Sequence, residues 1–97
     1  MSEAEDVFAE QVARWRVASW DTLRSNMKES PVVYEIEGSA GLNHQFEVLL
    51  MWDDPREETN IRVIIASDDG KGWRMSGLRG DGFIRAPDGS FVGEDGA

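Results

Sequence analysis

The chain has 97 residues, of which 40% are hydrophobic and 30% charged, and this balance is typical of one globular domain. Its formal net charge of −9 argues against nucleic acid and anionic membranes as partners, because both repel an acidic surface. The absence of cysteine excludes disulfides and thiolate metal sites and fits a reducing compartment. The N-terminal stretch is acidic and polar, and no apolar run reaches about 20 residues, so we expect a soluble cytoplasmic protein without a membrane anchor.

Residues 3–28 are predicted to form one long helix, because apolar side chains recur there at spacings of three and four. Pro31 disfavours helical geometry at the residue before it, so the helix should end before this point. Such a helix is about 39 Å long, whereas a seven-residue strand spans about 23 Å. The helix is therefore expected to overhang the sheet or to bend.

The remaining chain is predicted to form strands joined by short turns. Alternating or continuous apolar stretches, separated by turns rich in glycine, proline and aspartate, indicate these strands. The main strands are predicted at 32–37, 46–52, 61–66 and 73–76, with a last small hairpin formed by 83–86 and 90–92. Residues 77–82 are expected to form a glycine-rich loop, and residues 93–97 a disordered tail.

No helix separates the predicted strands, which argues against a parallel sheet. The sequence therefore predicts a single α+β domain, residues 1–97, with a long N-terminal helix packed on a four- to five-stranded antiparallel meander sheet. The predicted core consists of Phe8, Val12, Trp15, Leu23, Tyr34, Ile36, Phe46, Val48, Leu50, Val63 and Ile65.

Two of the predicted strands, 46–52 and 61–66, are apolar on both faces. One helix can bury only one face of a sheet, so the other face needs a partner, most simply a second copy of the chain. The residues expected at this contact are Val33, Leu49, Met51 and Ile64. Trp20 lies off the main apolar face of the helix, so it either joins this contact or folds back over the sheet edge.

No catalytic, metal-binding or cofactor-binding residue is predicted. His44 is the only histidine, and no nucleophile-elbow motif accompanies it, so we expect a solvated loop histidine rather than a member of a catalytic triad. The acids around Pro55 lack the spacing of an EF-hand calcium loop. A minor enzyme that uses His44 with a nearby carboxylate stays as an open alternative.

A local basic island lies beside the predicted loop 77–82, although the chain is acidic. Guanidinium groups together with loop amides can hold a phosphate or carboxylate, but the loop has no Walker pattern. The arginines of this island are Arg74, Arg79 and Arg85. The predicted function is thus a non-enzymatic protein-binding or adaptor module that forms a homodimer. The alternative is an anionic small-ligand site at these arginines.

Overall fold

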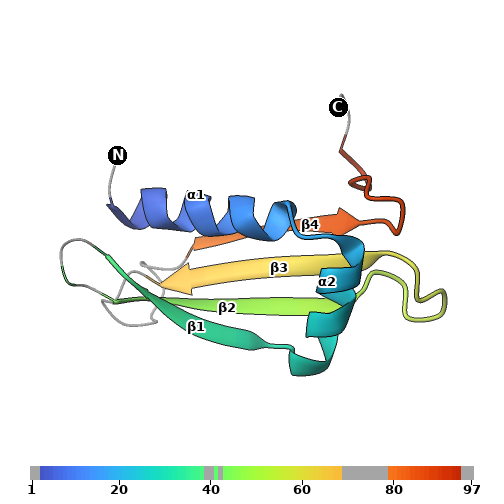
Figure 1. The fold of residues 1–97 in the computed structure, drawn as a ribbon, viewed down its shortest axis with the longest axis horizontal. Helices are drawn as coiled ribbons and strands as arrows, with labels where there is room; N and C mark the ends of the chain where they lie inside the picture. Colours follow the sequence, from blue (N-terminus) through green and yellow to red (C-terminus); the bar gives the residue numbers. More distant parts are fainter. Residues whose placement is uncertain (1–2, 39–40, 42, 69–78, 95–97) are drawn as a thin grey trace.

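The computed structural model describes residues 3–38, 41, 43–68 and 79–94, and it shows an α+β fold with helices on one side of an antiparallel sheet (Figure 1). The four strands lie in chain order, β1-β2-β3-β4, which confirms the predicted meander with four strands. In chain order the elements are α1 (Glu3–Arg16), α2 (Trp20–Asn26), the short 3-10 helix η1 (Met27–Glu29), β1 (Val32–Glu37), β2 (Asn43–Trp52), β3 (Ile61–Asp68) and β4 (Arg79–Arg85).

The single helix predicted over residues 3–28 is divided in two, which corrects that prediction. Ser19 has an extended backbone, and its hydroxyl oxygen accepts a hydrogen bond from the amide of Thr22 at 3.1 Å. This arrangement caps the start of α2, so the chain turns between the two helices. As Figure 1 shows, α1 runs along the sheet whereas α2 crosses one end of the strands. The turn resolves the expected mismatch between helix length and strand length.

The fourth strand differs from its predicted position. The stretch 73–76 lies outside the described residues, and the observed strand β4 includes residues 79–82, which were predicted to be a loop. Gly80 and Gly82 have low intrinsic strand preference, but β3 supplies a complete pairing partner, with Ala66 opposite Gly80 and Ile64 opposite Gly82. Tertiary pairing therefore outweighs local propensity at these glycines.

The small C-terminal hairpin is confirmed. Arg85 bridges Phe91, and the amide of Val92 donates to the carbonyl oxygen of Ile84 at 2.8 Å. Glu94, predicted to lie in a disordered tail, instead accepts two hydrogen bonds from the guanidinium of Arg16 at 2.7 and 3.1 Å. The remainder of the predicted tail, 95–97, lies outside the described residues.

The core lies between the helices and one face of the sheet. Its buried apolar residues are Val12, Leu23, Phe46, Val48, Leu50, Ile61, Val63, Ile65 and Phe83. Four other predicted core residues are partly buried against this cluster, namely Phe8, Trp15, Tyr34 and Ile36. The sequence prediction omitted Ile61 and Phe83. The molecule measures 42 × 30 × 22 Å along its principal axes, and the shortest extent corresponds to two layers of secondary structure. Among the described residues, no helix combines the length and apolar character that crossing a bilayer requires.

Candidate protein interface on the open sheet face

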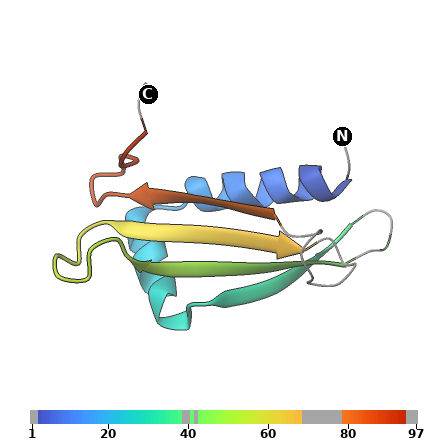
Figure 2. The ribbon, with the colours of Figure 1, turned by 180° about the vertical axis from the view of Figure 1, so that it is seen from behind.

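The two faces of the sheet have different surroundings. Residues paired across neighbouring strands point to the same side, so the register assigns each side chain to a face. Figure 2 shows the sheet from the side opposite α2, where no described helix lies over the strands. The predicted partner residues Val33, Leu49, Met51 and Ile64 all fall on this side, which we call the open face.

The open face carries an apolar band across its strands. Leu49 is paired directly with Ile64 at the centre of the sheet, and both side chains are half-buried by their neighbours alone. Val33 is 60% exposed and Met51 is 37% exposed. Ile84, paired with Arg62, extends the band onto β4. Removing these apolar side chains from water is favourable, so the band is the expected place for contact with another protein chain.

A shallow groove of about 230 Å³ lies beside this band. It forms where Gly82 presents bare backbone next to Ile64, while Ile84 and Val92 form its other apolar walls. Its polar lining comes from Arg62 and Glu94. The open face therefore offers both projecting apolar side chains and a hollow.

Charge is distributed unevenly over the open face. The acids Glu35, Glu37 and Glu47 lie on β1 and β2. Arg62 on β3 forms an ion pair with Asp53, with 2.7 Å between Nη2 and Oδ1. The β1–β2 half is therefore acidic, whereas the β3–β4 half carries a guanidinium among apolar side chains and glycine.

Trp20 lies on the opposite side of the sheet from the predicted interface. Its ring packs on Trp52 with 6.2 Å between centroids, and its indole nitrogen donates to the carbonyl oxygen of Thr59 at 2.9 Å. These contacts attach α2 to β2 and to the β2–β3 connection. Of the two alternatives for Trp20, the structure shows the one in which the ring folds back on its own sheet.

Arg85 is the member of the basic island whose side chain the structure describes, and its contacts are within the chain. Arg74 and the side chain of Arg79 lie outside the described residues. Arg85 is half-buried, donates to the carbonyl oxygen of Arg16, and stacks its guanidinium over Phe91 at 4.5 Å. Arg85 therefore attaches the C-terminal hairpin to the end of α1, and this role does not favour an anion site.

His44 is buried, which corrects the expectation of a solvated loop histidine. Its side chain is 3% exposed, and its Nε2 lies 3.2 Å from Oε2 of Glu3. The reason is that β2 begins at Asn43, three residues before its predicted start at Phe46, so His44 points to the helix side. The pair joins the start of α1 to the sheet.

No cluster of three or more acidic, histidine or cysteine side chains suitable for a metal occurs among the described residues. Comparison of the chain with protein-family models, with curated protein sequences and with solved structures finds no match.

Proposed function

We propose that this protein is a non-enzymatic protein-binding module of the cytoplasm that forms a homodimer through its open face. The observation that supports this proposal most strongly is the apolar band centred on the Leu49–Ile64 pair, which no described helix covers. A second copy supplies the same band and is the simplest partner for it.

The register indicates how two copies would pack. A two-fold axis parallel to the strands, between β2 and β3, sets Leu49 of each copy over Ile64 of the other. The same axis sets Glu47 over Ala66 of the other copy rather than over a second Glu47, because these two residues are paired in one row. The acidic half of one copy thus faces the less acidic half of the other, which avoids direct repulsion between carboxylates.

The size of the face predicts a weak dimer. Four strands about 4.8 Å apart and about seven residues long cover roughly 440 Å² per copy. Both copies together then bury on the order of 900 Å², which is below the usual range of stable specific interfaces. We therefore expect a reversible dimer whose population depends on concentration across the micromolar range.

The test is replacement of Leu49 by lysine. A buried, unpaired ammonium would oppose association, while in the monomer the same side chain can extend into water. Sedimentation velocity over a concentration series should show a monomer–dimer equilibrium for the wild type and a folded monomer for Leu49→Lys, with circular dichroism reporting the fold.

Val17→Lys provides the matched control. Val17 is 80% exposed and lies in the turn between α1 and α2, away from the open face, so this substitution makes the same chemical change outside the interface. It should leave the dimer unchanged. A wild-type chain that stays monomeric at millimolar concentration would refute the homodimer, and so would equal weakening by the two lysine variants.

A further inference from the structure

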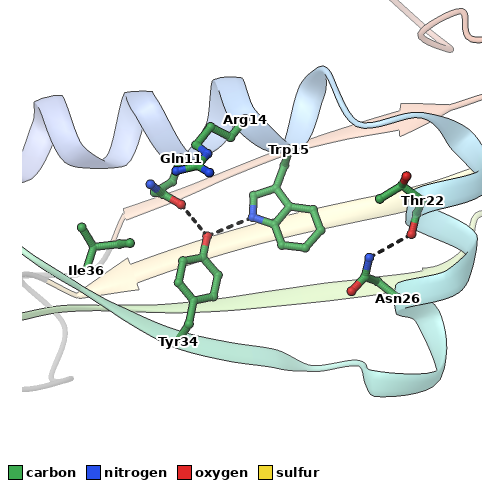
Figure 3. Close-up of a pocket in the computed structure, with 7 residues that line it drawn as sticks. All are labelled: Gln11, Arg14, Trp15, Thr22, Asn26, Tyr34 and Ile36. Atoms are coloured by element: carbon green, nitrogen blue, oxygen red, sulfur yellow. Dashed lines mark hydrogen bonds between the residues drawn. The ribbon is translucent and has the colours of Figure 1, made fainter.

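A groove of about 400 Å³ lies on the helix side of the sheet, separate from the open face (Figure 3). Its walls come from three elements: α1, α2 and the edge strand β1. The aromatic rings of Trp15 and Tyr34 form much of its apolar surface, together with Ile36. Thr22 and Asn26 of α2 line the groove at the end of the sheet that α2 crosses. The Asn26 amide donates to the carbonyl oxygen of Thr22 at 2.9 Å.

A chain of hydrogen bonds fixes the polar atoms of this groove. The indole nitrogen of Trp15 donates to the hydroxyl of Tyr34 at 2.9 Å, and that hydroxyl donates to Oε1 of Gln11, also at 2.9 Å. Figure 3 shows the three side chains converging on the tyrosine oxygen. The tyrosine proton has this one acceptor, so the amide oxygen of Gln11 must face it. The amide nitrogen of Gln11 must then point away.

That nitrogen is a donor without an acceptor. Gln11 is only 4% exposed, and its Nε2 is buried and makes no hydrogen bond among the described residues. A buried donor without an acceptor destabilises the folded state, because it has lost its hydrogen bonds to water. Gln11 lines the groove and the terminal torsion of glutamine is broad, so an acceptor bound in the groove can be reached by rotation of this amide. The groove thus holds a donor for which the described residues provide no acceptor.

A single cation accompanies this donor. Arg14 lines the groove, lies one helical turn after Gln11, and is in none of the ion pairs between described residues. Its charge acts on the groove: burial raises the pKa of Tyr34, while the Trp15 hydrogen bond and the nearby Arg14 guanidinium partly offset that rise. One guanidinium matches one negative charge. A phosphate dianion would need more cations than this corner of an acidic chain supplies.

We propose that this groove binds a small aromatic monocarboxylate. The carboxylate accepts from the Gln11 amide and pairs with the Arg14 guanidinium. The ring packs against Tyr34 and Trp15, as planar apolar groups prefer. The proposal does not depend on the homodimer, because the groove and the open face lie on opposite sides of the sheet.

Benzoate is the probe, titrated into the full chain and followed by ¹H–¹⁵N correlation spectra. The Gln11 side-chain amide and the Trp15 indole signal should shift saturably. Arg14→Gln should weaken benzoate binding about fivefold, the upper end of what one solvent-exposed ion pair contributes. Benzyl alcohol, which has the ring but no carboxylate, should bind more weakly than benzoate.

Arg56→Gln is the matched control, since it removes the same charge from a side chain that is 91% exposed in the β2–β3 connection. It should bind benzoate within twofold of wild type. Gln11→Leu keeps the side-chain bulk and removes the donors, so it should weaken binding; if it does not fold, the shift of the Gln11 amide in wild type and the comparison of the two arginine variants decide the question. Shifts that do not saturate, equal affinities of Arg14→Gln and Arg56→Gln, or shifts confined to the open face would each overturn the proposal.

Discussion

At position 82 the chain has room for a hydrogen atom but not for a side chain. A Cβ built on Gly82 would lie 2.9 Å from the carbonyl oxygen of Val63, which belongs to the backbone of the adjacent strand and cannot move aside cheaply. Gly80, two residues earlier in β4, is different, because a Cβ there would lie 3.9 Å from the nearest atom, the carbonyl oxygen of Ile65. The two glycines therefore have different roles in one strand.

Gly82→Ala should consequently lower the free energy of unfolding by about 1–3 kcal/mol, because the strands must separate locally to admit the methyl group. Gly80→Ala should be neutral or slightly stabilising, since alanine reduces the freedom of the unfolded chain and meets no clash. Urea denaturation of both variants measures this difference. Equal stability of the two variants would show that the spacing of β3 and β4 is not what requires glycine at position 82.

At the scale of single elements, the break between α1 and α2 depends on a short hydrogen-bonded cap. The hydroxyl of Ser19 accepts from the Thr22 amide and donates to the Thr22 hydroxyl at 3.0 Å. Asp21 in the first turn of α2 adds a negative charge at the positive end of the helix. A helix of only seven residues has little stability of its own, so its start must be held by such contacts and by packing.

Ser19→Ala should therefore reduce the free energy of unfolding by about 1 kcal/mol, the usual effect of removing a serine N-cap. Ser25→Ala is the matched control: it makes the same substitution within α2 at an exposed position, where alanine is the better helix former, and should cost nothing. Thermal unfolding followed by circular dichroism compares the two. A loss of stability for Ser25→Ala as large as for Ser19→Ala would contradict the capping role.

Some elements could be predicted from sequence because their pattern and their environment agree. Apolar and polar residues alternate cleanly in the strand Val32–Glu37. Leu49 and Ile64 were predicted on the uncovered face because both even- and odd-numbered positions of their strands carry apolar residues. A bend was one of the two outcomes expected for the long helix, but its position at Ser19 was missed because serine also fits the three-four spacing of the helix face. β4 was missed in part because pairing with β3, and not local propensity, makes Gly80 and Gly82 a strand.

The polar groove lay beyond sequence reasoning for another physical reason. Trp15 and Tyr34 were predicted as core residues, and their rings do pack against the core. Their polar tips, however, meet each other and Gln11 from elements 19 to 23 residues apart, and no spacing rule reports such a meeting. Only the fold shows that the Gln11 amide nitrogen finds no acceptor within the part of the chain that the structure describes.

For the whole molecule, net charge and the proposed dimer act against each other. Each copy carries a formal charge of −9, so association brings together two acidic molecules, although the proposed two-fold axis separates their most acidic strands. Raising the ionic strength from about 0.01 M to about 0.1 M shortens the screening length from about 30 Å to about 10 Å. The long-range repulsion then falls, while the apolar contact is little affected.

We therefore expect the dimer dissociation constant to decrease several-fold over this range of ionic strength, measured by sedimentation equilibrium in potassium chloride. The Val17→Lys variant, whose substitution lies outside the interface, should show the same dependence on ionic strength as the wild type. A dissociation constant that increases with salt would mean that ion pairs between the copies dominate, which the proposed packing does not contain.

Because the four strands that the structure describes form a meander in chain order, β1 pairs with only one of them, β2. An edge strand of this kind can detach without disturbing the β2–β3 and β3–β4 ladders. The amide hydrogens of β1 should therefore exchange with solvent faster than those of the two inner strands. Tyr34 and Ile36 travel with β1 when it lifts. Transient detachment of β1 would thus open the groove between α1, α2 and β1 and let a ligand enter it.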